Sequence, residues 1–250
     1  MKKFFLTLFF LSFASFVLAQ DAVTTSPVQQ PDVVTKMAVL AGLSILPFAV
    51  MLLTSFVKIV VVLSLLRNAL GVQQTPPNQV INGMALLLTL YVMFPTGVAM
   101  YDASKEVIIN QSPAKMFSED STGYVIAVVD KAKEPLRQFL QKNTSAKHIR
   151  SFYQIAEKSF PEPYKSELKT TDFIILIPSF ITTQLKAAFE IGVLIYLPFF
   201  VIDLVVSNIL LAMGMMMLSP LTIALPIKLL LLVMLDGWTL LVQGLILTFK

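Results

Sequence analysis

The stretch between Lys186 and Trp238 constrains this chain more than any other part of its sequence. It is long and apolar, and it is interrupted near its centre by the sequence MGMMMLSP at residues 213–220. Glycine and proline weaken or end helices, whereas the unbranched, polarizable methionine side chain packs against surfaces of many shapes. The pattern predicts two apolar helices joined by a pliable, uncharged loop. Its hinge residues are Gly214 and Pro220, and its candidate site residues are Met213, Met215, Met216 and Met217.

Charged residues interrupt this apolar stretch and also the first apolar block of the chain. Placing a charge inside a membrane costs free energy, so a charged residue there is expected by default to have a function. Lys186 and Glu190 are four residues apart, so they can pair on one helix face, and their apolar surroundings favour a neutralised pair inside an assembly over a wet surface pair. Asp203 has no cation nearby in the sequence, which predicts a partner elsewhere in this subunit or in the next. We expect structural or inter-subunit roles for Lys58, Arg67, Lys186, Glu190, Asp203, Lys228 and Asp236.

The composition is that of an integral membrane protein. Of the 250 residues, 56% are hydrophobic and only 14% are charged, whereas soluble domains carry about 25% charged residues. Most of the charge lies in residues 102–172, which are nearly neutral overall, so the small net positive charge gives no support for nucleic-acid binding. The chain has no cysteine, which excludes thiol-based metal or redox sites. No cofactor is expected, and the one histidine, His148, is expected on the surface.

The order of segments along the chain predicts an exported membrane protein. A basic start, a short apolar core and small residues before Gln20 indicate a secretory signal that is cleaved after Ala19, although a retained first transmembrane helix is the alternative. The predicted organisation is a signal peptide at 1–19, an exported linker at 20–36, a hydrophobic helical hairpin at 37–100, a mostly helical periplasmic domain at 101–172, and a second hydrophobic hairpin with the methionine-rich loop at 173–250.

The expected fold class is all-α, built from long kinked helices and helical hairpins. Residues 37–66 form an apolar run longer than one span requires, so it is expected to tilt, to kink near Pro47, or to leave the membrane with Lys58 turned toward protein. Four spans after a cleaved signal would place residues 102–172 outside. Because charges punctuate the apolar helices, some of these helices are expected to contact sister subunits instead of lipid.

Six ordered motifs resemble the FliP/SctR family, the export-gate membrane proteins of flagella and type III secretion injectisomes. The resemblance covers about residues 37–100 and 172–249, and residues 101–171 match it only in length and helical character. Some features of the chain resemble flagellar members and others resemble injectisome members. Overall, the chain resembles the injectisome form slightly more. The motifs are LRNALG at 66–71, PPNQV at 76–80, LPF at 197–199, IDLVV at 202–206, MGMMM at 213–217 and LDGW at 235–238.

The resemblance implies a ring of five copies at the bacterial inner membrane, which forms a helical, cone-like channel entry that is largely raised out of the bilayer plane. Its companions in the family are small gate proteins of the FliQ/SctS and FliR/SctT types and a switch protein of the FlhB/SctU type. The methionine-rich loop is a gasket around the closed pore in family members, and Met215, Met216 and Met217 occupy the matching positions, with Met213 adjacent. The implied substrate is unfolded polypeptide. The resemblance also implies a multi-pass membrane protein in contact with lipid, with the charged segment on the periplasmic side.

Two other classes of function remain open from the residues themselves. A proton-coupled secondary transporter could use Glu190, Asp203 and Asp236 as a relay, although about four spans and no inverted repeat argue against it. An intramembrane enzyme would need a nucleophile–base pair or a metal cluster, and the apolar blocks contain no histidine or cysteine. The sequence also lacks a phosphate-binding loop of the G-x-x-x-x-G-K type, so the energy for export is expected to come from another component.

Overall fold

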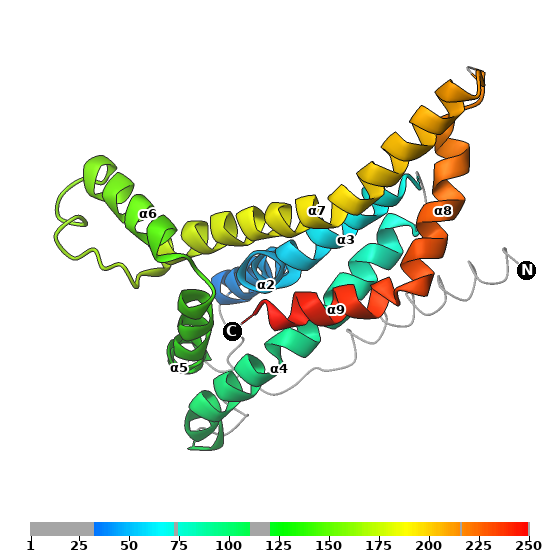
Figure 1. Ribbon diagram of the computed structural model, residues 1–250. Helices are drawn as coiled ribbons and strands as arrows, with labels where there is room; N and C mark the ends of the chain where they lie inside the picture. Colours follow the sequence, from blue (N-terminus) through cyan, green and yellow to red (C-terminus); the bar gives the residue numbers. More distant parts are fainter. Residues whose placement is uncertain (1–32, 73–74, 111–120, 216, 250) are drawn as a thin grey trace, which may run out of the picture.

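The computed structural model describes residues 33–72, 75–110, 121–215 and 217–249, and every regular element in these ranges is an α-helix (Figure 1). The predicted all-α class is therefore confirmed for the described chain. The predicted signal peptide, most of the predicted linker and Met216 lie outside the described residues. The helices are α2 (Val33–Leu53), α3 (Phe56–Leu70), α4 (Asn78–Asn110), α5 (Ser121–Lys142), α6 (Ala146–Ser159), α7 (Phe173–Ala212), α8 (Pro220–Met234) and α9 (Gly237–Leu247).

Helix α3 lies at the centre of the molecule. It is short, but it is rich in valine, leucine and isoleucine and is buried on several sides. Val62 packs with Ala188 of α7 and Leu245 of α9, while Leu66 packs with Phe199 of α7 and Leu232 of α8. On another side, α3 meets the start of α4. Because a helix that is apolar on all sides must be covered on all sides, the other hydrophobic helices are arranged around it.

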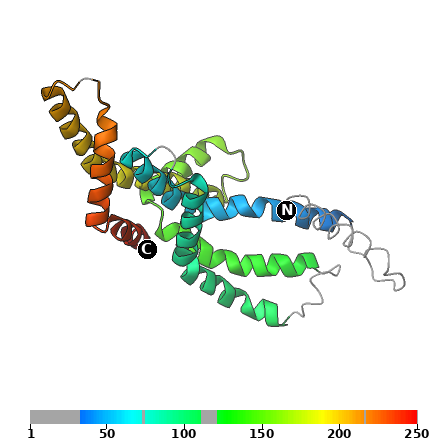
Figure 2. The same cartoon turned by 90° about the vertical axis from the view of Figure 1, so that its right-hand side faces the viewer.

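Helices α7 and α8 form a long antiparallel hairpin that extends beyond the rest of the molecule (Figures 1 and 2). The hairpin ends in the loop that follows Ala212 and precedes Pro220, as the sequence predicts. Beyond α8 the chain turns by 65° into α9, which returns beneath α7 toward α3. Asp236 adopts a left-handed backbone conformation at this turn, with φ 48°, and the short polar side chain of aspartate tolerates that conformation.

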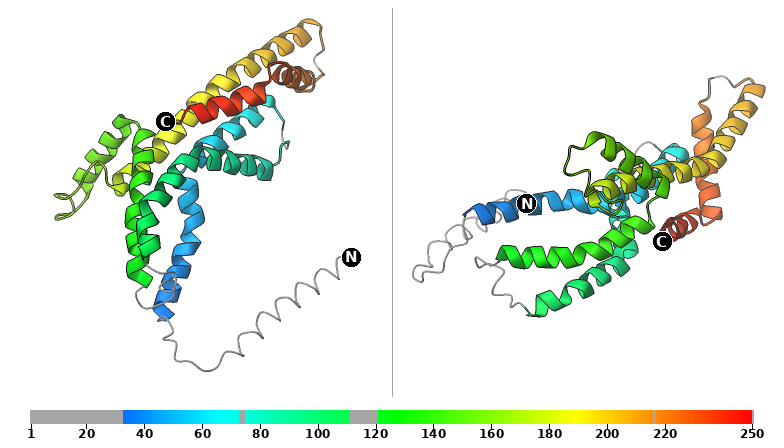
Figure 3. Two further views of the ribbon diagram at one scale, coloured as in Figure 1. Left: turned by 90° about the horizontal axis from the view of Figure 1, so that it is seen from below. Right: turned by 90° about the vertical axis from the view of Figure 1, so that its left-hand side faces the viewer.

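The described helices of the predicted periplasmic segment pack against the long apolar helices on either side of it in the chain. Helix α4 continues to Asn110, beyond the expected end of the first hydrophobic hairpin, and α5 packs antiparallel against it (Figure 3). Helix α6 packs against α7 instead. Phe139 and Leu140 of α5 are buried with Leu176 and Phe180 of α7, so the first turns of α7 and the end of α5 share one apolar cluster. The boundary of the inserted domain remains a prediction.

Two helices, α4 over Asn78–Lys105 and α7 over Phe173–Ala212, are long and apolar enough to cross a membrane by themselves. The candidate spans number four if each bent pair of helices is counted as one span, since Pro47–Leu53 with Phe56–Leu70 and Pro220–Met234 with Gly237–Leu247 also pass this test together. These helices agree with the apolar composition and support a membrane protein.

The first apolar run bends where α2 meets α3. Pro47 lies inside α2, whereas a bend of 75° separates α2 from α3 at Thr54 and Ser55. The hydroxyl group of Thr54 donates a hydrogen bond to the carbonyl oxygen of Val50 at 2.5 Å and accepts one from the backbone N–H of Phe56 at 3.4 Å. Side-chain hydroxyls that replace backbone partners in this way favour helix ends and bends. Beyond the bend, Lys58 is buried, which agrees with its expected orientation toward protein.

The close approach of α3 and α7 predicts a cost for adding one methyl group. A Cβ atom at Gly192 would lie 2.2 Å from Cδ1 and 3.3 Å from Cβ of Leu65. We expect Gly192→Ala to destabilise the fold by about 1–3 kcal/mol through overpacking. Gly83→Ala on α4, where a Cβ would meet nothing within 4 Å, is expected to be neutral or slightly stabilising. Thermal unfolding in detergent tests both, and Leu65→Ala should rescue Gly192→Ala; equal melting temperatures for the two glycine variants would contradict the close contact.

Candidate functional site

The methionine-rich loop lies at the outer end of the α7–α8 hairpin (Figure 1). Helix α7 ends at Ala212. Gly214, just beyond it, adopts a left-handed conformation, φ 73°, and the N–H of Met215 donates a hydrogen bond to the carbonyl of Leu210 at 3.0 Å. Glycine at this position permits the chain to leave the helix, because glycine has no Cβ atom that would clash in the left-handed conformation. Pro220, the first residue of α8, has the fixed φ that favours a helix start.

The described methionine side chains of this loop are exposed in the single chain. Met213 is 66% exposed, Met215 is 45% exposed and Met217 is fully exposed. Leu218 and Leu221, which follow them, are also exposed. Thioether side chains have no strong hydrogen-bonding group that water would satisfy, so an exposed cluster of them at the end of a hairpin indicates a contact surface.

An ion pair between a buried lysine and a partly exposed aspartate fixes the hairpin against α3. The Nζ atom of Lys228, on α8, lies 2.7 Å from Oδ2 of Asp203 on α7, and it also donates a hydrogen bond to the carbonyl oxygen of Ala69 on α3 at 3.1 Å. The Lys228 side chain is only 2% exposed, whereas that of Asp203 is 33% exposed. The ammonium group therefore joins three helices, and Asp203, which has no cation nearby in sequence, has its partner within the same chain.

Apolar contacts extend this attachment toward the loop. Val206 and Leu210 of α7 are buried against Ala224 of α8, and Ile202 and Ile223 pack beside them. At the end of α3, Gly71 adopts φ 79°, and a Cβ added there would lie 3.0 Å from Cδ1 of Leu221. The base of the hairpin is thus packed on α3, and the packing ends before the methionines.

Arg67, at the end of α3, holds the connection between α3 and α4. Its guanidinium donates hydrogen bonds to Oδ1 of Asn78 at 2.5 Å and to the carbonyl oxygen of Pro76 at 3.3 Å. Asn78 is the first residue of α4. Since LRNALG and PPNQV are two of the motifs that carry the family resemblance, this contact joins two of them in space.

The remaining predicted charges lie in three different environments and do not meet at one site. Lys58 is buried, and its Nζ atom lies 4.1 Å from the ring centroid of Phe249. Lys186 and Glu190 are 3.4 Å apart, and both side chains are 63% exposed. Asp236 accepts a hydrogen bond from the hydroxyl of Thr239 at 2.9 Å. The three carboxylates of the proton-relay hypothesis therefore have separate partners.

Sequence reasoning missed the polar contacts that fix α6 and the end of α5 to α7. The amide of Gln184 donates a hydrogen bond to the carbonyl oxygen of Asn143 at 2.7 Å, and Nδ1 of His148 lies 2.8 Å from the hydroxyl oxygen of Thr183. His148 is half-buried here, not a free surface residue. The run of polar residues TTQ at 182–184, inside an otherwise apolar helix, was the available signal. No group of three or more His, Asp or Glu side chains that could hold a metal ion occurs in the described ranges.

The asymmetric burial of the ion pair predicts an asymmetric response to its removal. Asp203→Asn leaves a buried ammonium group without a counter-charge and is expected to cost about 3 kcal/mol. Lys228→Met leaves a carboxylate that can reach water, so it is expected to cost less, about 1–2 kcal/mol for the lost hydrogen bonds. Thermal unfolding of the detergent-extracted chain measures both.

The double variant Asp203→Asn with Lys228→Met should be more stable than Asp203→Asn alone, because the buried charge is gone. A double variant that melts below both single variants would contradict the ion pair. The proton-relay hypothesis makes a different prediction for Asp203→Asn: loss of pH-coupled transport with the assembly intact.

Comparison with known proteins gives the relationship of this chain. The model of the FliP family matches residues 39–245. The chain is 47% identical to Yop proteins translocation protein R of Yersinia pestis over 226 residues, which is 89% of this chain and 99% of the relative. It is 47% identical to virulence protein YscR of Salmonella typhimurium over 208 residues, 83% of this chain and 93% of that protein. It is 41% identical to the flagellar biosynthetic protein FliP of Pectobacterium carotovorum over 216 residues, 86% of this chain and 78% of that protein. The chain belongs to the FliP family.

Proposed function

We propose that this chain is a membrane component of a type III protein-secretion apparatus and that several copies of it form the entry gate through which unfolded polypeptides are exported across the inner membrane. The observation that carries the proposal is the end of the α7–α8 hairpin, where methionine side chains are exposed on a packed and ion-paired support. The names of the relatives, which refer to translocation and flagellar biosynthesis, support the same class of function.

In this proposal the methionine loops of neighbouring copies converge on one axis and close it. A ring of thioether side chains adapts to an unfolded polypeptide of any sequence, since its contacts are non-directional and its rotamers are many. A narrow apolar constriction also resists wetting, which maintains the barrier to ions when no substrate is present. The chain itself acts passively as a gasket and performs no catalysis.

The surface that would meet neighbouring copies lies on α7. Large apolar side chains are exposed along most of its length, and the Lys186–Glu190 pair lies among them. Isolated soluble proteins rarely expose apolar patches of this extent. We assign this face to contacts with further copies of the chain, with companions of the FliQ/SctS, FliR/SctT and FlhB/SctU types, and with lipid. The exposed residues are Phe189, Val193, Leu194, Leu197, Phe200, Val201, Leu204 and Val205.

The proposal places the assembly, of five copies by family resemblance, in the bacterial inner membrane. Helices α5 and α6 would lie on the periplasmic side, because the segment that contains them follows a predicted exported start and carries most of the charge. Long charged loops cross membranes largely regardless of their charge, so the location of this segment depends on the number of spans before it. The candidate span in α4, after the bent α2–α3 pair, is consistent with this orientation.

Replacing Met215, Met216 and Met217 by alanine tests the gasket. The smaller side chains should leave the closed channel open to water, so ion leakage across the membrane should rise severalfold while the assembly still forms. Met234→Ala, at an exposed methionine on α8 outside the loop, is the matched control and should leave the membrane tight. Ion conductance of membrane vesicles and the mass of the extracted complex measure the two effects. Tight vesicles with normal export in the triple variant would refute the gasket.

Reversing one charge on the exposed face of α7 tests its proposed role in assembly. Glu190→Lys places two cations one helical turn apart, which costs an isolated exposed helix only about 0.5 kcal/mol. The single chain should therefore fold normally. If the face is covered by another subunit, the uncompensated charges should reduce the yield of the extracted complex severalfold. Lys131→Glu on α5 is the control. An unchanged yield of complex in Glu190→Lys would show that this face is not a subunit interface.

A further inference from the structure

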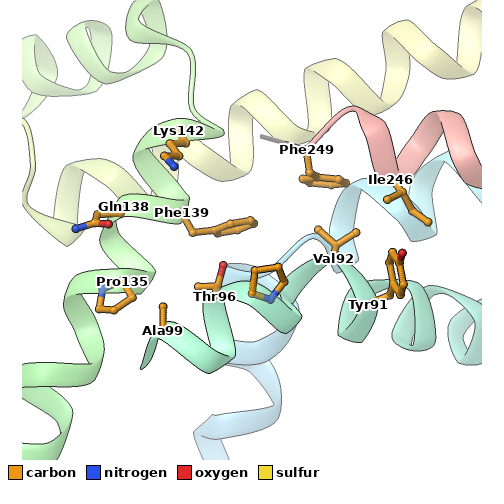
Figure 4. Close-up of a pocket in the computed structure, with 11 residues that line it drawn as sticks. Tyr91, Val92, Thr96, Ala99, Pro135, Gln138, Phe139, Lys142, Ile246 and Phe249 are labelled. Atoms are coloured by element: carbon orange, nitrogen blue, oxygen red, sulfur yellow. The ribbon is translucent and has the colours of Figure 1, made fainter. Parts of the chain in front are cut away.

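A cavity of about 450 Å³ opens between α4, α5 and the C-terminal part of the described chain (Figure 4). A water molecule takes up about 30 Å³ of liquid volume, so the cavity has room for several side chains. Its walls are mainly apolar, with Val92 and Pro95 on α4, Phe139 on α5, and Ile246 and Phe249 at the end of the chain. The function proposed above assigns no role to this cavity.

The edge of the cavity is positively charged. Lys142, the last residue of α5, lines it, is exposed, and takes part in no ion pair among the described residues. The described lining includes no aspartate or glutamate. A second cation, Lys58, is buried behind Phe249, with its Nζ atom 4.1 Å from the ring centroid. The cavity therefore favours an occupant that is apolar and carries a negative charge.

The opposite combination lies at the other end of α9. The chain turns by 65° between α8 and α9, and we call the residues Leu235, Asp236 and Trp238 at this turn the α8–α9 corner. Both of its large apolar side chains are exposed, and the carboxylate between them is exposed as well. Asp236 caps no backbone N–H of α9, and it forms no ion pair in the part of the chain that the structure describes. The corner thus presents a negative charge between apolar side chains.

One chain cannot place this corner in its own cavity. Helix α9 begins at the corner and ends at the cavity wall (Figure 1), and its 11 residues span about 16 Å. The two features are therefore held apart at opposite ends of one helix. A ring of identical chains is closed by head-to-tail contacts, in which two different surfaces of each chain meet. The corner and the cavity are two such surfaces, and they are complementary in charge.

We infer that the α8–α9 corner of one copy inserts into the cavity of the next copy, with Leu235 against Phe139 and Phe249 and with Asp236 paired to Lys142. The inference rests on the assembly of several copies proposed above and adds a pair of surfaces that join them. The apolar insertion excludes water, and the ion pair at the edge sets the register of the two copies.

Cross-linking between copies tests this contact, because the chain has no cysteine of its own. Leu235→Cys and Ala99→Cys, the second at an exposed position of the cavity lining, are combined in one chain of the complete complex and treated with a short bis-maleimide. Head-to-tail contact should give a ladder of products at multiples of the chain's mass, and each single variant should give none. Leu235→Cys with Val129→Cys, at an exposed position of α5 outside the cavity, is the matched control and should also give none.

The ion pair is tested in the same cysteine background. Asparagine tolerates the left-handed backbone of position 236, so Asp236→Asn should keep the shape of the corner. Asp236→Asn and Lys142→Gln should each lower the cross-linked fraction severalfold, and the double variant should lower it no further than either one, because both remove the same contact. Lys142→Arg should keep the wild-type value. Lys131→Gln, at an exposed lysine of α5 outside the cavity, is the control.

The outcomes separate this inference from the proposed function. A complex of several copies that gives no ladder would overturn the inference alone, and so would products that stop at the dimer, which indicate a two-fold contact. Unchanged cross-linking in Asp236→Asn and Lys142→Gln, or losses that add in the double variant, would overturn the ion pair and with it the inference. A complex that contains a single copy of the chain would overturn both the inference and the proposed gate.

Discussion

The Lys228 ammonium group is the interaction on which the arrangement of the hydrophobic helices depends. A buried charge is costly unless it is paired and hydrogen-bonded, and Lys228 meets this requirement only where α7 supplies Asp203 and α3 supplies the carbonyl oxygen of Ala69. Few relative positions of three helices satisfy both contacts. The ion pair thus contributes specificity more than stability, since well-packed apolar residues could replace such a pair at little cost. It fixes the direction in which the α7–α8 hairpin leaves the core.

The packing of the hairpin consequently changes along its length. Its base is held by the ion pair and by apolar packing against α3, whereas its end has exposed side chains and a left-handed glycine. Local stability follows buried contacts, so the end is the part of the hairpin that yields at least cost. A gate requires this combination, because the closing element has to deform around different polypeptides while its position stays fixed. The function proposed for the loop therefore depends on residues more than one helical turn away from it.

Local sequence patterns predicted the elements well and the long-range contacts poorly. The end of α7 and the start of α8 follow from Gly214 and Pro220, which act through their own backbone preferences. Asp203 lacks a local cation, so the sequence predicts that it has a partner, but which cation it meets depends on how the hairpin closes. The backbone carbonyl of Ala69 carries no side-chain signal at all. A kink near Pro47 was one of three expectations for the first apolar run, and the bend before α3 lies instead at Thr54 and Ser55, where the Thr54 hydroxyl bonds to the backbone.

The surface of the single chain also shows that the fold is completed by contacts outside it. Its central helix is satisfied by neighbours in the same chain, yet most of α7 beyond its first turns exposes large apolar side chains. Lipid alone could cover these side chains, but it would not solvate Lys186 and Glu190, which lie among them and are more than half exposed. Burial of that pair against hydrocarbon would be expensive. A protein neighbour can supply both apolar cover and polar partners, so the position of this ion pair is itself an argument for protein contacts along this face.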